Sequence, residues 1–217
     1  MIYLFGSMER GDYDHKSDKD ILVIVRGKKD REKILERFVG EQANISVYGI
    51  DRLRAMHTQG HLFVWHLFKE AKFIGDSRMD DVIHKLGRPS LYKDAGKDIS
   101  NLRDLFETCV GNLNSSNPIY EKGLIYVSLR NTSISSSWYA STGLDFTRYS
   151  PYSNQVSNKY FEIPISVYDH LIDCRLATTR GIEPKHSEMN VTNADIETMR
   201  KWFDINYTIA TETSDGV

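Results

Sequence analysis

The sequence has little cysteine and no long apolar run. Cys109 and Cys174 are the only cysteines among 217 residues, which argues against a disulfide framework or a cysteine-rich metal site. No stretch approaches the roughly 20 consecutive apolar residues that a membrane-spanning helix needs. The apolar opening MIYLF is too short for a signal peptide. We therefore expect reduced thiols in a cytoplasmic protein that has no membrane partner.

A strong excess of one charge is also missing. The 28 Lys and Arg residues nearly balance the 30 Asp and Glu residues, giving a net charge of −2. This balance argues against a large nonspecific nucleic-acid surface, although it leaves a local basic cleft open. The hydrophobic fraction of 40% and the charged fraction of 27% are typical of a folded globular chain. The length suits one compact domain or two small ones.

The order of the predicted elements indicates an α+β fold, with a small mixed sheet followed by a helical bundle. In the first part, apolar runs predict strands at 1–5, 20–25 and 44–50, with helices at 28–42 and 60–74, the latter ending in a short strand at 72–74. Ile34, Leu35 and Phe38 are expected to face inward from the first of these helices. In the second part, helices are predicted at 99–113, 118–141, 164–181 and 192–210. Gly, Pro and Ser cluster at 88–96, so we place the domains at 1–88 and 89–217.

The stretch LFGSMERGDYDHKSDKDILVIV, Leu4 to Val25, carries the strongest functional signal. Residues two apart on a strand point to the same face, so Asp18 and Asp20 are expected to present two carboxylates together. Two close carboxylates repel each other. A magnesium ion would relieve this repulsion, because it prefers oxygen ligands and commonly shares them with substrate phosphates.

The Gly-Ser turn before this pair is suited to phosphate. Gly6 allows close approach of the backbone, whose N–H groups can bind an anion, and the Ser7 hydroxyl can donate to a phosphate oxygen. Arg10 adds positive charge one turn later, and Ser17 directly precedes the acids. The alternative is that the aspartates only cap a turn and end a strand, which is the usual role of an isolated Asp-x-Asp pair.

This ordered set of elements resembles the signature of the polymerase-beta-type nucleotidyltransferase superfamily. Its minimal and antibiotic-modifying bacterial branches are the most similar. The resemblance implies a magnesium-dependent transferase that moves a nucleoside monophosphate from a nucleoside triphosphate, with ATP as the expected donor, to an acceptor hydroxyl or phosphate, and releases pyrophosphate. The resemblance assigns metal binding and catalysis to Asp18 and Asp20. It assigns nucleotide binding to four residues, Gly6, Ser7, Arg10 and Ser17.

The sequence departs from that family pattern at Asn44. The family usually has a third carboxylate on the next strand, where this chain places Asn44, and an asparagine cannot act as the base for an attacking hydroxyl. Either Asp51 or Glu70 substitutes for it, or the acceptor needs no strong base. Otherwise the protein is a nucleotide-binding regulatory or antitoxin-like protein with weak or no transfer. A plain protein-binding module is a third reading.

A small molecule, a protein side chain and a nucleic-acid end are all chemically compatible with the proposed transfer. A homodimer and a separate partner protein are both left open, since symmetric dimers are the commonest oligomers.

Three histidines lie close together in the sequence at His57, His61 and His66. They lack the glutamate of a zinc-binding HExxH motif, so we predict no zinc there. Gly60 is expected to interrupt any helix through the first two. His66 and Glu70 are four residues apart on one helix face, which favours a hydrogen bond between them.

The helical half offers weaker signals. In the helix from Pro118, the predicted apolar stripe contains Leu124, Val127, Ile134 and Trp138, and Asn131 falls on the same face. A buried Asn131 would need a hydrogen-bond partner.

The remaining basic residues of the helical half fall in two segments. Arg148 and Lys159 lie in an aromatic connector that either packs on the bundle or binds a base and phosphate. Arg175 and Arg180 are directed either at phosphates or at acids within the bundle. Likewise, Arg130 either is structural or contacts a ligand.

Overall fold

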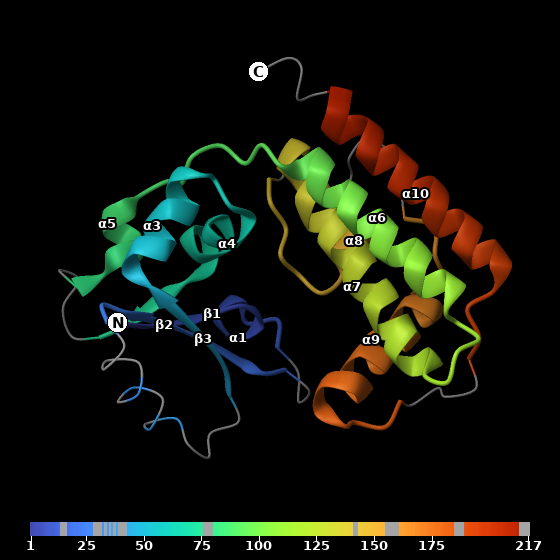
Figure 1. The fold of residues 1–217 in the computed structure, drawn as a ribbon, viewed down its shortest axis with the longest axis horizontal. Helices are drawn as coiled ribbons and strands as arrows, with labels where there is room; N and C mark the ends of the chain where they lie inside the picture. Colours follow the sequence, from blue (N-terminus) through green and yellow to red (C-terminus); the bar gives the residue numbers. More distant parts are fainter. Residues whose placement is uncertain are drawn as a thin grey trace. The chain divides into compact units, whose positions relative to one another are not determined.

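The chain forms a mixed α+β structure with two compact units, Met1–Tyr92 and Lys93–Val217 (Figure 1). The structure is a computed structural model, and it describes residues 1–13, 17–27, 32, 34, 36, 38, 43–75, 80–140, 143–154, 161–184 and 189–212. The predicted fold class, a small mixed sheet followed by a helical region, is confirmed. The assignment of functional domains to 1–88 and 89–217 stays a prediction.

The first unit is built on a four-stranded sheet in the order β3-β2-β1-β4. The strands are β1 (Ile2–Phe5), β2 (Lys19–Val25), β3 (Ala43–Gly49) and β4 (Lys72–Ile74). β2 runs parallel to β3 and antiparallel to β1, which in turn pairs antiparallel with β4. All four strands were expected from the apolar runs, with ends that differ by at most one residue.

The central strand β2 is buried on both faces, as its continuous apolar run predicted. Leu22 and Ile24 face a core formed with α3 (Ile50–Thr58), α4 (Leu62–Glu70) and α5 (Val82–Leu86). The alternate residues of the strand pack on the opposite face against Ile34 and Phe38, among others. This contact confirms the inward orientation of those two side chains. Leu35 and most of the predicted helix at 28–42 lie outside the described residues.

Tyr3 ties the sheet to the segment that follows β4. Its side chain is only 1% exposed, and its hydroxyl donates to Asp81 Oδ1 at 3.1 Å and accepts from the Val82 N–H at 2.8 Å. Desolvation and the Asp81 carboxylate raise the pKa of Tyr3 to about 12. The phenol is therefore held in its neutral form as a structural hydrogen-bonding group.

The first unit extends to Tyr92 because the segment after α5 folds back on the turn between α3 and α4. Trp65 Nε1 donates to Ser90 O at 2.9 Å, and His57 Nε2 lies 3.1 Å from Gly87 O. Gly60, with φ +69°, lets the turn approach this segment so closely that a Cβ would lie 2.1 Å from a backbone oxygen. Gly60 thus separates α3 from α4, as predicted. The helix α3 itself was not predicted.

The second unit is helical and is organised around one central helix. The helices are α6 (Ala95–Gly111), α7 (Pro118–Ser136), α8 (Ser150–Ser153), α9 (Ile165–Arg180) and α10 (Asn193–Glu212), with a 3-10 turn η2 (Ser137–Tyr139) after α7. α7 contacts the four other helices (Figure 1). None of the helices among the described residues is long and apolar enough to span a membrane.

The ends of these helices follow the expected capping chemistry. Asn117 accepts from the Tyr120 N–H and Pro118 occupies the first turn of α7. Gly181 ends α9 in the left-handed conformation that glycine tolerates best. At the start of α10, Thr192 and Asp195 exchange side-chain-to-backbone hydrogen bonds.

The predicted apolar stripe of α7 is wrong. Of Leu124, Val127, Ile134 and Trp138, only Ile134 is fully buried, and Asn131 is half-buried. Because α7 is contacted from several sides, its buried residues form no single stripe and include several small polar ones. These buried residues are Gly123, Ile125, Ser128, Leu129, Thr132, Ser133, Ile134, Ser135 and Ser136.

The α7 helix also ends earlier than predicted. The Ser136 and Ser137 hydroxyls donate to carbonyls three residues back, and Ser137 Oγ accepts from the Asp145 N–H. These side chains compete for the backbone groups that would continue the helix.

Candidate active site

The site begins where β2 enters the sheet. Asp20 is the second residue of β2 and stands between two neighbouring strands, opposite Phe5 of β1 and Asn44 of β3. It falls on the same face of the strand as Leu22, by the two-residue period of a strand. The interior of β2 is almost completely buried, so Asp20 is fixed to a rigid support at its end.

Gly6 lies directly against the Asp20 carboxylate. It follows β1 with φ 77° and ψ −153°, a conformation almost restricted to glycine. A Cβ on Gly6 would lie 2.6 Å from Asp20 Oδ2, much closer than van der Waals contact allows. The glycine is therefore required both by its backbone conformation and by the carboxylate beside it.

Asn44 holds the other oxygen of the same carboxylate. Its Nδ2 donates to Asp20 Oδ1 at 3.0 Å, which the direct Asp20–Asn44 pairing between parallel strands allows. Asn44 thus lies beside Asp20, at the position where the family pattern usually has a third carboxylate. Sequence reasoning found this position but missed the hydrogen bond, which depends on the strand register.

The other predicted site residues lie around this point. Ser7 begins the short helix α1 (Ser7–Arg10), directly after Gly6. Ser17 and Asp18 precede β2, which starts at Lys19, so Asp18 is just outside the strand on which it was predicted. Both are half-buried. Their roles in metal and nucleotide binding stay predictions.

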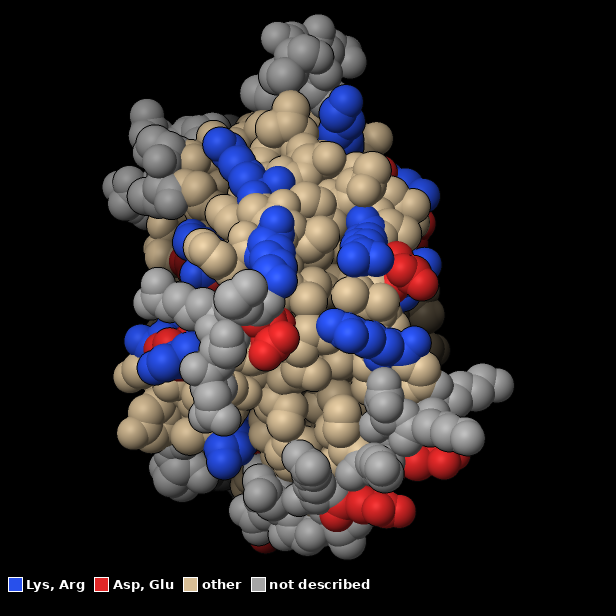
Figure 2. All heavy atoms as spheres, turned by 90° about the vertical axis from the view of Figure 1, so that its left-hand side faces the viewer, with Lys and Arg blue, Asp and Glu red and all other residues tan. Residues whose placement is uncertain are grey.

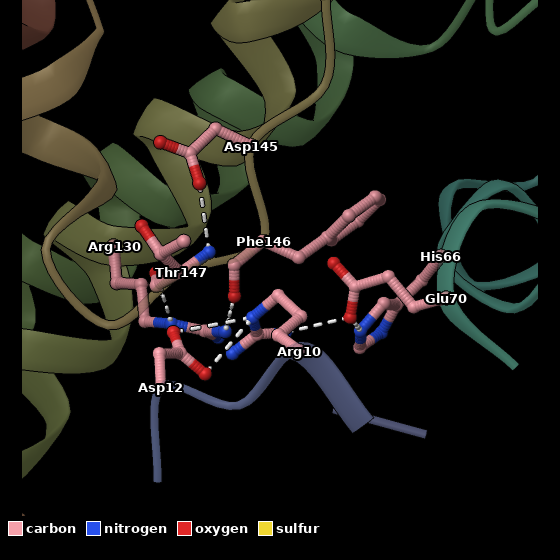
Figure 3. A network of polar contacts seen from close by, with 8 residues as sticks. All are labelled: Arg10, Asp12, His66, Glu70, Arg130, Asp145, Phe146 and Thr147. Carbon is pink, nitrogen blue, oxygen red and sulfur yellow. Dashed lines mark hydrogen bonds and ion pairs between the residues drawn. The ribbon is translucent and has the colours of Figure 1, made fainter. Parts of the chain in front are cut away.

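Arg10 at the end of α1 is held by two carboxylates. Its Nη1 donates to Glu70 Oε2 at 2.6 Å, and its Nε lies 3.2 Å from both oxygens of Asp12. Glu70 also lies 2.8 Å from His66 Nε2, as predicted for this pair on α4. Figure 3 shows the Arg10 guanidinium between Asp12 on one side and Glu70 with His66 on the other.

These contacts make Glu70 a structural anion. Its side chain is 7% exposed. Burial alone would raise its pKa, but the hydrogen bond from His66 and the charges of His66 and Arg10 outweigh burial and lower the pKa below the usual value. Glu70 thereby fixes the orientation of Arg10 relative to the Gly-Ser turn. Asp51, the other carboxylate considered as a substitute base, is exposed on α3 beside Arg54.

The remaining histidines have structural contacts. His61 Nδ1 accepts from the Phe63 N–H and caps α4. His57 contacts the backbone at Gly87. Among the residues that the structure describes, no group of three or more His, Cys, Asp and Glu side chains is arranged to hold a metal.

The residues around Asp20 nevertheless fit a magnesium ion shared with phosphates. Asp18 and Asp20 would supply carboxylate oxygens of the kind that magnesium prefers, and such sites normally complete the coordination with water and substrate. Gly6 brings no side chain against Asp20 Oδ2, which a Cβ at position 6 would approach to 2.6 Å. The neutral amide of Asn44 orients the carboxylate without adding a charge.

In the helical unit, the aromatic connector packs into the bundle. Tyr152 and Phe161 lie edge-on to each other at 5.0 Å, and both contact Tyr168 on α9. Phe161 also contacts Trp202 on α10. These contacts agree with the packing interpretation. Lys159, the other basic residue of the connector, lies outside the described residues.

Among the residues that the structure describes, the basic side chains on the surface of the first unit are interspersed with acidic ones. Figure 2 shows Lys and Arg spread over the upper and middle part of one face, with Asp and Glu between and below them. Exposed basic residues of this unit include Arg52, Arg54 and Lys85. Within the described part of this unit, the mixed pattern lacks the continuous positive surface that nonspecific nucleic-acid binding favours.

Comparison with known proteins gives one result. The family model described as "Nucleotidyltransferase domain" matches residues 1–73, which includes the Gly-Ser turn, both aspartates, Asn44 and Glu70. No curated protein and no solved structure matches the chain. The first unit therefore carries a nucleotidyltransferase domain, which confirms the superfamily that the motif predicted. The minimal or antibiotic-modifying branch stays a prediction.

Proposed function

We propose that the nucleotidyltransferase domain of residues 1–73 transfers a nucleoside monophosphate from a nucleoside triphosphate to an acceptor hydroxyl or phosphate. The observation that carries this proposal is the clamped Asp20 carboxylate, with Gly6 against one oxygen and the Asn44 amide on the other. This arrangement joins the end of the Gly-Ser turn to the acidic strand, which supports the proposal that the phosphate-binding and metal-binding residues act together.

Each residue has a defined part in the proposal. Asp18 and Asp20 would hold magnesium, which when bound supplies positive charge against the triphosphate and the leaving pyrophosphate. Gly6 and Ser7 bind phosphate oxygens through the backbone and the hydroxyl, and Ser17 supplies a second hydroxyl. Arg10, oriented by Glu70, adds positive charge, and ATP is the expected donor.

The proposed reaction is a displacement at the α-phosphorus. The acceptor oxygen forms a bond to this phosphorus, and the bond to the oxygen that bridges to the β-phosphate breaks. Pyrophosphate leaves with the electron pair, and the acceptor proton passes to a carboxylate or to solvent. Asn44 cannot take this proton, because an amide is not a base at neutral pH.

Asn44 also favours a second candidate function. A site that binds nucleotide but lacks the third carboxylate could serve a regulatory or antitoxin-like protein with weak or no transfer. This candidate predicts magnesium-dependent binding of a nucleoside triphosphate without release of pyrophosphate, whether or not a partner protein is present.

The test is release of pyrophosphate from each of the four nucleoside triphosphates with magnesium, together with calorimetric binding. We compare the wild type with Asp18→Asn, Asp20→Asn and the double variant. Release is expected to fall by at least about 100-fold, the scale on which one electrostatic group in a transition state acts. Asp104→Asn, an exposed aspartate on α6, is the matched control and should change nothing.

The outcomes separate the candidates. Release that depends on Asp18 and Asp20 establishes the transferase and identifies its donor. Magnesium-dependent binding without release supports the regulatory candidate. Undiminished release in a folded double variant, with folding checked by thermal denaturation, would contradict the assignment of both aspartates.

A further inference from the structure

Two carboxylates hold Arg10, and they are bound in different ways. The Glu70 side chain is 7% exposed, and its Oε2 accepts from Arg10 Nη1 at 2.6 Å and lies 2.8 Å from His66 Nε2. The Asp12 side chain is 39% exposed, and both of its oxygens lie 3.2 Å from Arg10 Nε. Figure 3 shows the two carboxylates on different sides of the guanidinium.

Glu70 is the fixed partner of Arg10. It stands at the end of α4, 60 residues further along the chain, so its position is set by the packing of the first unit. If this carboxylate left Arg10 and His66, it would give up two hydrogen bonds while staying largely out of water, which is strongly unfavourable. The bond between Glu70 and Nη1 is therefore a permanent part of the site.

Asp12 is the exchangeable partner. It lies only two residues after Arg10, and the left-handed turn at Gly11, with φ 80°, ends α1 between them. The single Nε–H is shared between both Asp12 oxygens, so neither bond has the best geometry. Exposed ion pairs contribute little to stability, because water competes for both charges. An anion that binds Arg10 more strongly can therefore take the place of Asp12.

The charges of these four residues show what such an exchange changes. Arg10 contributes one positive charge, and Asp12 and Glu70 contribute two negative ones. Even with His66 protonated, the group of four has no net positive charge while Asp12 is in contact. Positive charge is offered to an incoming anion only when Asp12 leaves.

The geometry of the guanidinium indicates which atoms then become available. The described contacts of this group use Nε for Asp12 and Nη1 for Glu70. Nε and Nη2 donate along the same edge of the planar group. Departure of Asp12 frees this edge for two parallel hydrogen bonds to a phosphate group, while Glu70 keeps Nη1.

We propose that Asp12 competes with the phosphate chain of a nucleoside triphosphate for the Nε–Nη2 edge of Arg10. Asp12 neutralises Arg10 in the free protein and is displaced when the phosphate chain binds, whereas Glu70 holds the guanidinium in both states. Asp12 is thus a positioning residue that weakens the binding of phosphate and favours multiply charged anions, which displace it best. The choice of phosphate as the competitor rests on the proposed function, in which Arg10 adds charge to the triphosphate site.

The test is calorimetric titration of the full chain with inorganic tripolyphosphate in EDTA, which removes any magnesium-dependent binding. Wild type is compared with Asp12→Asn, Arg10→Gln and the double variant, with folding checked by thermal denaturation. Asp204→Asn is the matched control, because Asp204 is also exposed and lies 2.7 Å from an arginine, Arg103. Asp12→Asn and Asp204→Asn both leave Arg10 and Glu70 in place, so their comparison does not depend on the stability of Arg10→Gln.

We expect Asp12→Asn to bind tripolyphosphate about two- to fivefold more tightly than wild type, since an exposed ion pair no longer has to be broken. Asp204→Asn should bind like wild type, and Asp12→Asn should bring no gain in the Arg10→Gln background.

Equal or weaker affinity in Asp12→Asn would overturn the proposal, and so would the same gain without Arg10, which would reduce the effect to net charge. Absence of tripolyphosphate binding in both wild type and Asp12→Asn would overturn it as well. Because these titrations contain no magnesium and no nucleoside, their failure leaves the transferase to its own test. Equally, pyrophosphate release that does not depend on Asp18 and Asp20 leaves the competition at Arg10 to be decided here.

Discussion

Substitution of Gly6 by alanine tests the geometry of the candidate site most directly. The new methyl group would lie 2.6 Å from Asp20 Oδ2 and 3.4 Å from its Cγ. Since the obstructing atoms are the carboxylate itself, the Asp20 side chain must rotate away or the turn must shift. Either change breaks the arrangement in which Asn44 holds the other carboxylate oxygen at 3.0 Å.

The backbone adds a separate cost. A side chain at φ 77° and ψ −153° is in a region that only glycine adopts readily, at a cost of about 1–3 kcal/mol. The first unit should tolerate such a loss, because small domains are stable by about 5–15 kcal/mol. We therefore expect Gly6→Ala to remain folded while magnesium-dependent nucleotide binding and pyrophosphate release are lost.

The matched control is Gly11→Ala. Gly11 also has a positive φ, 80°, but a Cβ there would meet nothing within 4 Å, so the substitution costs about 1–2 kcal/mol of strain without touching a carboxylate. Urea denaturation should show a loss of stability in both variants, larger in Gly6→Ala because of its contact with Asp20, whereas binding and release should fail only in Gly6→Ala. Full activity in Gly6→Ala would refute the close approach of Gly6 to Asp20.

Asn44→Asp would set a second carboxylate beside Asp20, so divalent-metal affinity should rise and pyrophosphate release should become more pH-dependent, as measured by Mn²⁺ titration and a pH–rate profile. Glu70→Gln should lower the free energy of unfolding by roughly 1–3 kcal/mol, since Arg10 loses its anion and the hydrogen bond with His66 is weakened. Because the pKa of Glu70 is lowered in the folded state, wild-type stability should decline as pH falls below 4.5, the ordinary value, and the variant should lack this part of the decline in acid titration. Gly123→Ala should cost about 1–3 kcal/mol in urea denaturation, because the methyl group would press on Arg175 Cα.

Each of these changes has a control in the same chain. Asn101→Asp, exposed on α6, should leave metal affinity unchanged. Glu212→Gln, exposed at the end of α10, should keep the acid decline of the wild type. Gly111→Ala, with open space around its Cβ, should be neutral or slightly stabilising. If a control variant showed the same change as the test variant with which it is paired, the structural explanation given for that test variant would be wrong.

Local chemistry made much of the first unit predictable. The continuous apolar run of β2 indicated a strand buried on both faces, and the Gly-Ser turn with Asp18 and Asp20 indicated the nucleotidyltransferase domain. In the second unit, the first-turn proline Pro118 and the glycine Gly181 marked helix ends correctly. These signals reside in neighbouring residues, because strand periodicity and helix capping act over a few positions.

Local chemistry was not sufficient where packing decides. The stripe predicted for α7 failed because several helices surround α7, so its buried residues are not confined to one face. The helix α3 was missed because its segment has exposed charged residues around only two buried ones, Leu53 and Met56. Burial of such a helix depends on the sheet and helices that cover it.

In the candidate site, too, some features follow from the local sequence and others from the tertiary structure. The sequence by itself determined which residues are the candidates for its chemistry, since the turn and the acidic pair lie within a short stretch. Only the tertiary structure decided that Asn44 donates to Asp20, which requires the register of two parallel strands. It alone brought Arg10 to Glu70, 60 residues away. Contacts between distant segments are set by the closing of the sheet and the packing of helices on it, and no local pattern encodes them.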